Sequence, residues 1–156
     1  MSKSLKRVRA ALEDAGVVVE IVEMSEGTRT AAEAAAAAGC EIDQIAKSII
    51  FAGAESGGLF LFITAGGNQV DPVKASALAG EELVRADAGE VRKMTGFAIG
   101  GVSPVGHLTA PTTFFDKRLS DFDVVWAAAG TPRHIFAIRP AVLSEITKTE
   151  QSDFTS

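Results

Sequence analysis

The sequence predicts a single α+β domain, and three observations lead to that fold class. The chain has 156 residues, which is the usual length of one domain and enough to bury a core without disulfides. Its hydrophobic content of 47% and its mean hydropathy of +0.21 are typical of a globular protein. Strand-like apolar runs and helix-like segments are mixed without the regular alternation of a parallel sheet.

The N-terminal region is predicted to contain a helix, a strand and a second helix. Ser4 is placed to cap a helix over residues 5–15, whose apolar residues share one face. The β-branched residues of segment 17–22 favour a strand. Thr30, with Glu33 three residues later, forms a capping-box pattern before the helix Ala31–Ala38, and Gly39 is placed to end that helix.

Two apolar runs in the middle of the chain are predicted to form a β-hairpin. They cover residues 47–54 and 59–64, and the Glu-Ser-Gly-Gly segment between them is typical of a turn. Asp71 then precedes a proline and is placed to cap a short helix over Pro72–Ala79. The hairpin puts Lys47 at the start of its first strand.

The second half of the chain is predicted to contain short strands and two further helices. Asp87 is placed to cap a helix over residues 88–94, and Pro140 to begin a final helix ending near Thr147. The strands are predicted at residues 83–84, 96–99, 112–115, 124–128 and 135–138, with a turn at 130–133 between the last two. We expect residues 1–148 to form one domain and residues 149–156 to be a frayed polar tail.

The overall charge limits the choice of partners. The chain has 15 Lys and Arg against 20 Asp and Glu, a net charge of −5 at pH 7. A protein that binds RNA tightly by itself carries a basic surface, because it gains affinity when counterions leave the phosphates. The sequence therefore favours weak binding of nucleic acid, or binding that a partner protein assists.

Other features of the sequence exclude several classes of protein. No segment approaches the ~20 apolar residues of a membrane helix, and the N-terminus lacks the apolar core of a secretory signal. The single cysteine, Cys40, excludes an internal disulfide and fits a reducing compartment. The two histidines do not have zinc-ligand spacing, and no phosphate or dinucleotide loop is present. We expect a cytoplasmic protein without a membrane anchor, metal or cofactor.

A glycine-rich segment between residues 95 and 107 is the most informative motif. It holds four glycines and Pro104. Glycine lets the backbone approach a ligand closely, and proline fixes the chain that follows. Such a segment presents backbone N–H groups to an anion, or to a carbonyl oxygen that becomes negative during a reaction. The same composition also describes a tight turn without a ligand.

Lys47 is the second candidate, because its neighbours in the chain are apolar. An ammonium group in a cleft holds a carbonyl or phosphate oxygen, and burial there lowers the pKa of the lysine. The other interpretation is a lysine that extends its charged end into solvent from the end of a strand. Both interpretations fit the residues around Lys47 equally well.

Together these segments resemble the YbaK/ProX family, the free-standing relatives of the editing domain of bacterial prolyl-tRNA synthetase. The resemblance covers nearly the whole chain, to Leu143. It rests on Thr28-Arg29-Thr30, on Ala46-Lys47-Ser48 with the apolar strand after it, on Val70-Asp71, and on the Gly-x-x-x-Pro loop of residues 100–104. It implies a curved mixed β-sheet, partly closed like a barrel, with helices packed outside.

The resemblance also implies a site. Lys47 and Gly101 would be its catalytic groups, with Lys47 anchoring the substrate and the N–H groups of residues 101–103 holding an oxyanion. The expected substrate-binding residues are Thr28, Arg29, Thr30, Gly100, Val102, Ser103, Pro104, Gly106, His107 and Asp116. Arg29 would meet a phosphate and His107 a ribose, whereas Asp116 would orient the loop or Lys47.

Three of these residues also have a plain structural interpretation. Thr30 is a helix cap, His107 a surface residue and Asp116 a turn former at a strand end. Ser103 is not a nucleophile, because neither a Gly-x-Ser-x-Gly elbow nor a placed His and acid pair accompanies it. The sequence offers no general base, and the resemblance supplies one in a ribose hydroxyl of the substrate together with ordered water.

The expected function is therefore metal-independent hydrolysis of the ester of a small mischarged amino acid on tRNA, with Cys-tRNA(Pro) as the leading substrate. The branch of the family that clears alanine carries a histidine in the strand matching residues 124–129, which here contains none. The partners implied are the acceptor end of tRNA and prolyl-tRNA synthetase. The alternatives are a non-catalytic module that binds a synthetase or an aminoacyl ligand, and a general small-ester hydrolase.

Overall fold

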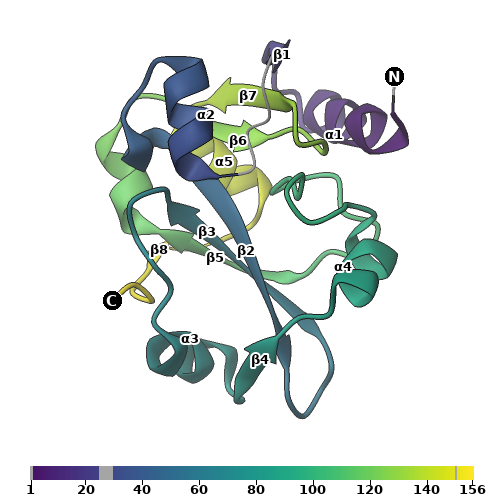
Figure 1. The fold of residues 1–156 in the computed structure, drawn as a ribbon, viewed down its shortest axis with the longest axis vertical. Coiled ribbons are helices and arrows are strands. Elements are labelled where there is room, and N and C mark those ends of the chain that lie inside the picture. Colours follow the sequence, from purple (N-terminus) through teal and green to yellow (C-terminus); the bar gives the residue numbers. More distant parts are fainter. Residues whose placement is uncertain (1, 25–29, 150) are drawn as a thin grey trace.

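The structure contains two β-sheets with helices packed against them (Figure 1). This computed structural model describes residues 2–24, 30–149 and 151–156. The helices are α1 (Lys3–Asp14), α2 (Ala31–Ala38), η1 (Ile42–Gln44), α3 (Pro72–Ala79), α4 (Ala88–Thr95), η2 (Lys117–Asp121) and α5 (Pro140–Ile146), where η marks a 3-10 helix. The strands are β1 (Ile21–Glu23), β2 (Ala46–Gly53), β3 (Leu59–Ala65), β4 (Leu83–Arg85), β5 (Thr112–Asp116), β6 (Val125–Ala128), β7 (His134–Ile138) and β8 (Gln151–Ser152).

The strand order confirms the predicted α+β class and corrects one detail. One sheet has the order β4-β2-β3-β5-β8 and mixes antiparallel and parallel pairs, and the other has the antiparallel order β1-β7-β6. The expected barrel-like closure is not found, because the described strands form two separate sheets. The sheets approach each other where Ile45, just before β2, forms an isolated bridge with Trp126 of β6.

The main core lies between the two sheets and is covered by α1 and α5. Every residue of β3 is buried, and successive side chains of this strand point to opposite faces. Leu61 and Ile63 face the main core, which α1 completes with apolar residues spaced three and four apart. Phe60 and Phe62 face the other side, where they pack with Phe154 from the C-terminus and with α3.

Most of the predicted helix ends are confirmed. The side chains of Thr30, Asp71 and Asp87 accept hydrogen bonds from backbone N–H groups in the first turns of α2, α3 and α4. The first helix differs, because it begins at Lys3. Its cap is Ser2 and not Ser4, since the side chain of Ser2 accepts a hydrogen bond from the N–H of Leu5. No helix in the described ranges is long and apolar enough to cross a membrane.

Three predicted segments are wrong. Residues 17–20 are not part of a strand, since pairing with β7 begins only at Ile21. Residues 96–99 lead into a turn that the N–H of Gly101 closes on the carbonyl of Ala98, so no strand forms there. The C-terminal residues are not frayed: β8 pairs with β5, and the ring of Phe154 is fully buried.

Candidate functional site

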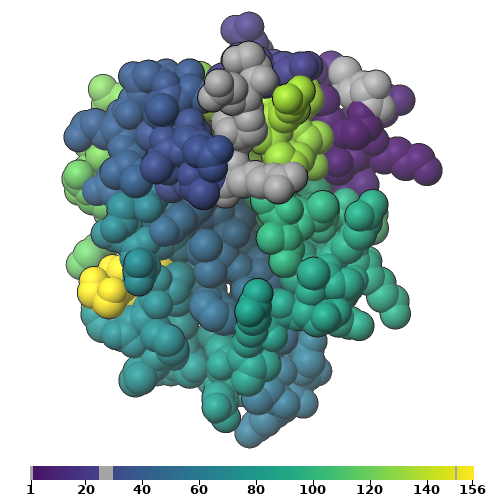
Figure 2. Space-filling view, viewed as in Figure 1, coloured from purple at the N-terminus to yellow at the C-terminus, as the bar shows by residue number. Residues whose placement is uncertain are grey.

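A cavity of about 610 Å³ lies where the two sheets approach each other, and it is the candidate site. Its walls come from β2, the first turns of α2, the loop after α4, and strands β6 and β7. In Figure 2, β2 lies at the bottom of a recess whose right-hand wall is α4 and the loop that follows it. The lining is mainly Ala, Ile and Val with Trp126, so the cavity suits a small apolar group.

Lys47 lies at this cavity, near the start of β2. Its ammonium nitrogen donates hydrogen bonds to the backbone carbonyls of Gly66, at 3.2 Å, and of Asn68. Burial lowers the pKa of Lys47, although the negative charges of Asp116 and Asp43 act in the opposite direction. Lys47 therefore carries a partly buried ammonium group held by carbonyl dipoles, and it is not a lysine reaching freely into solvent.

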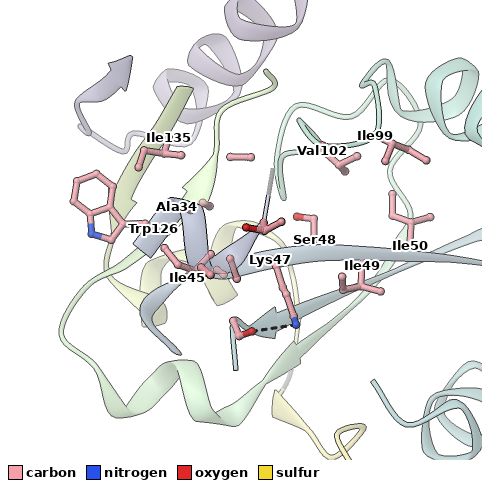
Figure 3. Close-up of a pocket in the computed structure, with 18 of the residues that line it drawn as sticks. Ala34, Ile45, Lys47, Ser48, Ile49, Ile50, Ile99, Val102, Trp126 and Ile135 are labelled. Atoms are coloured by element: carbon pink, nitrogen blue, oxygen red, sulfur yellow. Dashed lines mark hydrogen bonds between the residues drawn. The ribbon is translucent and has the colours of Figure 1, made fainter. Parts of the chain in front are cut away.

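The side chain of Lys47 does not point toward the glycine loop. Figure 3 shows Lys47 leaving β2 on the side opposite Ser48, and Val102 lies on the Ser48 side. The alternation of side chains along a strand explains this difference, because neighbouring residues face opposite sides. Both Lys47 and Val102 line the cavity, but the structure does not bring the ammonium group together with the loop amides.

Asp116 is linked to Lys47 through the turn after β3. Asp116 is 3% exposed, and its carboxylate accepts hydrogen bonds from the N–H of Ala65 at 3.0 Å and from the side-chain amide of Asn68 at 2.9 Å. It also accepts a hydrogen bond from the N–H of Arg118 at 3.0 Å, and through this bond Asp116 caps η2. Asp116 therefore ends a strand, and it binds Asn68, whose backbone carbonyl accepts from the ammonium group of Lys47. Its expected role in orienting Lys47 stays a prediction.

The glycine loop contributes backbone to the cavity wall through Gly100, and side chains through Ile99 and Val102. Gly100 has a φ of +95°, and a Cβ on Gly101 would come within 2.9 Å of the backbone of Thr131. The N–H of Gly101 donates to Ala98, so it is not available to an oxyanion. Within the described ranges, the N–H groups of Val102 and Ser103 have no hydrogen-bond partner.

The remaining residues of the loop lie behind the cavity wall. Ser103 and Pro104 are buried, and the carbonyl of Ser103 accepts a hydrogen bond of 2.6 Å from Nε2 of His107. The His107 ring also packs edge-on against Phe97, and burial lowers its pKa. Gly106 packs on α1, where Nε of Arg7 donates to its carbonyl. These residues shape the loop and do not line the cavity.

The segment before α2 is described in part. Thr30 lines the cavity, and its hydroxyl oxygen accepts from the N–H of Glu33 at 3.1 Å. Thr30 is therefore a helix cap that also borders the candidate site. Thr28 and Arg29, the other two residues expected here, lie outside the described residues.

Two cavity residues were missed by the sequence analysis. The hydroxyl of Ser48 is buried and has no hydrogen-bond partner in the described part of the chain. Strand alternation was the available signal, because a polar residue next to Lys47 must face the other side of β2. Trp126 of β6 lines the opposite wall, and no local signal in its strand distinguishes it from a core residue.

An apolar cavity with one lysine in its wall, between two sheets of an α+β domain, defines a binding site for a small ligand. The chain belongs to the aminoacyl-tRNA editing domain family, whose profile matches residues 25–146. The resemblance of the sequence to the YbaK-like editing proteins is thereby confirmed.

The chain is similar to a curated relative and to solved structures over nearly its whole length. The chain is 31% identical to "Uncharacterized protein YwhH" of Bacillus subtilis (strain 168) over 92% of this chain and 91% of the relative. It is similar to the crystal structure of "a putative trans-editing enzyme for prolyl tRNA synthetase", with 44% identity, a TM-score of 0.93, and coverage of 100% of this chain and 99% of that one. It is also similar to "hypothetical protein APE2540", with 27% identity, a TM-score of 0.88, and coverage of 96% and 99%.

Proposed function

We propose that the protein is a trans-editing aminoacyl-tRNA deacylase that hydrolyses the ester of a small mischarged amino acid, with Cys-tRNA(Pro) as its main substrate. The observation that carries this proposal is the apolar cavity with Lys47 in its wall, where the ammonium nitrogen of Lys47 donates to the carbonyl of Gly66, another lining residue. Membership of the editing-domain family supplies the class of substrate. The similarity to a structure described as trans-editing for prolyl-tRNA synthetase supports the choice of proline tRNA.

Lys47 is proposed to bind the carbonyl oxygen of the aminoacyl ester. An ammonium group has three N–H donors, and two of those on Lys47 go to the carbonyls of Gly66 and Asn68. The third is left for the substrate. Water attacks the carbonyl carbon, the bond from that carbon to the ribose oxygen breaks, and the ribose oxygen takes a proton. The positive charge of Lys47 stabilises the oxyanion formed on the way.

The walls of the cavity favour cysteine over alanine and serine. Apolar walls accept a thiol, which behaves as a small hydrophobic group with a weak S–H donor, and they disfavour a more polar hydroxymethyl group. The unpartnered hydroxyl of Ser48 offers a contact to a thiol that alanine does not make. The absence of a histidine from residues 124–129 also distinguishes this cavity from that of the alanine-clearing branch.

The proposed partners are the acceptor end of tRNA and prolyl-tRNA synthetase, and the proposed location is the cytoplasm. The net charge of −5 disfavours strong binding of tRNA by this chain alone. A synthetase that has just released its mischarged tRNA would supply the missing affinity. We expect no metal to be required, because the positive charge of Lys47 stabilises the oxyanion.

The test is hydrolysis of Cys-, Ala- and Ser-tRNA(Pro) by the wild-type protein and by Lys47→Ala. We expect hydrolysis of Cys-tRNA(Pro) by the wild type and a loss of roughly 100-fold or more in the variant, since one electrostatic donor to an oxyanion contributes that much. Lys74→Ala is the matched control, because Lys74 lies on α3 and pairs with the exposed Asp153. Hydrolysis of free cysteine esters at the same rate would instead support a general esterase.

A second candidate function is a non-catalytic module that binds an aminoacyl ligand or a synthetase. One observation favours it: Lys47 is the sole ionisable side chain among the described residues that line the cavity, so none of them is a general base. Binding of the aminoacyl-tRNA by the wild type without hydrolysis, even with prolyl-tRNA synthetase present, would establish this alternative.

A further inference from the structure

The ammonium group of Lys47 rests on a tight turn that joins β3 to the segment before α3. The turn comprises residues 66–68 (the 66–68 turn), and its first and last residues direct their carbonyls at the ammonium nitrogen. Figure 3 shows the first of these two hydrogen bonds, to the carbonyl of Gly66, as a dashed line from Lys47. The direction of the ammonium group therefore depends on the position of two backbone carbonyls, and a displaced turn would displace the charge.

Two carboxylates hold the 66–68 turn from two different elements. Asp116, at the end of β5, binds the side-chain amide of Asn68 at 2.9 Å. Asp43, in η1, accepts a hydrogen bond of 2.8 Å from the N–H of Gly67. The second oxygen of Asp43 is 3.0 Å from Nε of Arg118, which ties η1 to η2.

The turn also packs directly against η1. A Cβ on Gly66 would lie 2.1 Å from the carbonyl oxygen of Ile42, and one on Gly67 would lie 2.4 Å from a carboxylate oxygen of Asp43. Atoms cannot approach so closely, so a side chain at position 66 would displace the backbone of η1, and one at position 67 would displace the carboxylate of Asp43. The glycines and the two carboxylates together fix the turn in one place.

We propose that Asp43 and Asn68 are positioning residues of the editing reaction, which hold the 66–68 turn so that it aims the ammonium group of Lys47 at the substrate. The chemistry of this step rests on the proposed function. Neither residue lines the cavity, so both act through the turn and through Lys47. Asp116 has the same role on the other side of Asn68.

The charges around Lys47 give the proposal a second, independent consequence. The carboxylates of Asp116 and Asp43 both raise the pKa of Lys47 against the effect of burial. Arg118, from η2, is paired with Asp43 and with Asp121. Asp43→Asn keeps an oxygen that accepts from Gly67 but removes one negative charge. The ammonium form of Lys47 then loses stabilisation, so the pKa of Lys47 falls and the proton leaves at a lower pH.

The experiment combines an NMR titration of the side-chain Cε methylene of Lys47, assigned with Lys47→Ala, and deacylation kinetics of Cys-tRNA(Pro) over the same range of pH. In Asp43→Asn we expect the NMR midpoint and the alkaline limb of kcat/KM to move together to lower pH. The Asn68→Ala variant keeps the charges of Asp43 and Asp116. We expect its kcat to fall roughly 10-fold to 100-fold, because the ammonium group of Lys47 is misplaced.

Asp121→Asn is the matched control, because it removes the other ion pair of Arg118 at an exposed carboxylate that does not touch the turn. It should leave the midpoint and kcat as in the wild type. An Asp43→Asn midpoint equal to that of the wild type, or an Asn68→Ala protein with wild-type kcat, would overturn the proposal. A wild type that hydrolyses no ester would overturn the proposed function instead, and a shifted midpoint in Asp43→Asn would then still support the positioning of Lys47.

Discussion

At the scale of single residues, Ser48 tests the selectivity of the cavity. Its buried hydroxyl has no partner in the described structure, and we expect the thiol of a cysteinyl substrate to satisfy it. We expect Ser48→Ala to lower kcat/KM for Cys-tRNA(Pro) by about 5-fold to 10-fold, which corresponds to one hydrogen bond of ~1 kcal/mol. Hydrolysis of Ala-tRNA(Pro) is the internal control and should not fall. An equal loss for both substrates would show that Ser48 serves the fold and not selectivity.

His107 gives a prediction on stability rather than activity. Its Nε2 donates to Ser103, its Nδ1 is buried without a partner in the described structure, and burial lowers its pKa. The unfolded chain, with a histidine pKa of about 6.5, therefore binds a proton that the folded chain resists. The stability that the neutral ring of His107 contributes is fully present above about pH 6.5, and it is lost as the pH falls below that value.

The measurement for His107 is urea unfolding at about pH 7.5 and about pH 5.5. The free energy of unfolding should fall more between these pH values in the wild type than in His107→Gln, which keeps an N–H donor for the carbonyl of Ser103. Equal losses in the two proteins would contradict the prediction.

Sequence reasoning identified some site residues and could not have identified others. Lys47 stood out because a charge among apolar neighbours is a local signal. Asp43 and Asn68 gave no such signal, because each acts through a partner that is distant in the chain: Gly67 is 24 residues from Asp43, and Asp116 is 48 residues from Asn68. These contacts arise only when β3, β5 and the two 3-10 helices are assembled.

At the scale of elements, the C-terminal segment tests how the second core is closed. β8 adds to the edge of the five-stranded sheet, and Phe154 packs against Phe62 with ring centroids 5.0 Å apart. We expect Phe154→Ala to lower the free energy of unfolding by roughly 3–5 kcal/mol, the usual cost of emptying a buried aromatic site. Val18→Ala is the control, because Val18 is 99% exposed and should cost almost nothing. A loss below about 1 kcal/mol for Phe154→Ala would mean that the segment detaches easily.

The same segment shows where element prediction fails. Its polar composition predicted fraying, and a single phenylalanine reversed the outcome because the ring fills a site that the rest of the chain leaves open. For residues 17–20 the prediction was wrong in the opposite direction, because it placed order where none of the pairing exists. Their β-branched side chains favour a strand, but pairing with β7 begins only at Ile21. Helix ends were predicted well because a cap such as Asp71 acts within three residues.

At the scale of the whole molecule, the question is how an acidic chain meets a polyanionic substrate. The net charge of −5 repels tRNA at long range, and the cavity contributes one lysine that is engaged by the carbonyls of Gly66 and Asn68. We therefore expect the recognition surface to neutralise few phosphates. Each neutralised phosphate of duplex nucleic acid contributes about 0.9 to the slope of log K against log salt concentration.

We therefore expect proline tRNA without an attached amino acid to bind this protein weakly and with a shallow salt dependence. The slope of log K against log salt concentration should be about −2 to −3, measured by fluorescence anisotropy between roughly 50 and 200 mM salt. Addition of prolyl-tRNA synthetase should raise kcat/KM for Cys-tRNA(Pro), because the synthetase supplies the contacts to the body of the tRNA. A slope steeper than about −6 for the protein alone would contradict this view. It would require a local basic surface strong enough to overcome the net charge, and then the synthetase would not be needed for delivery.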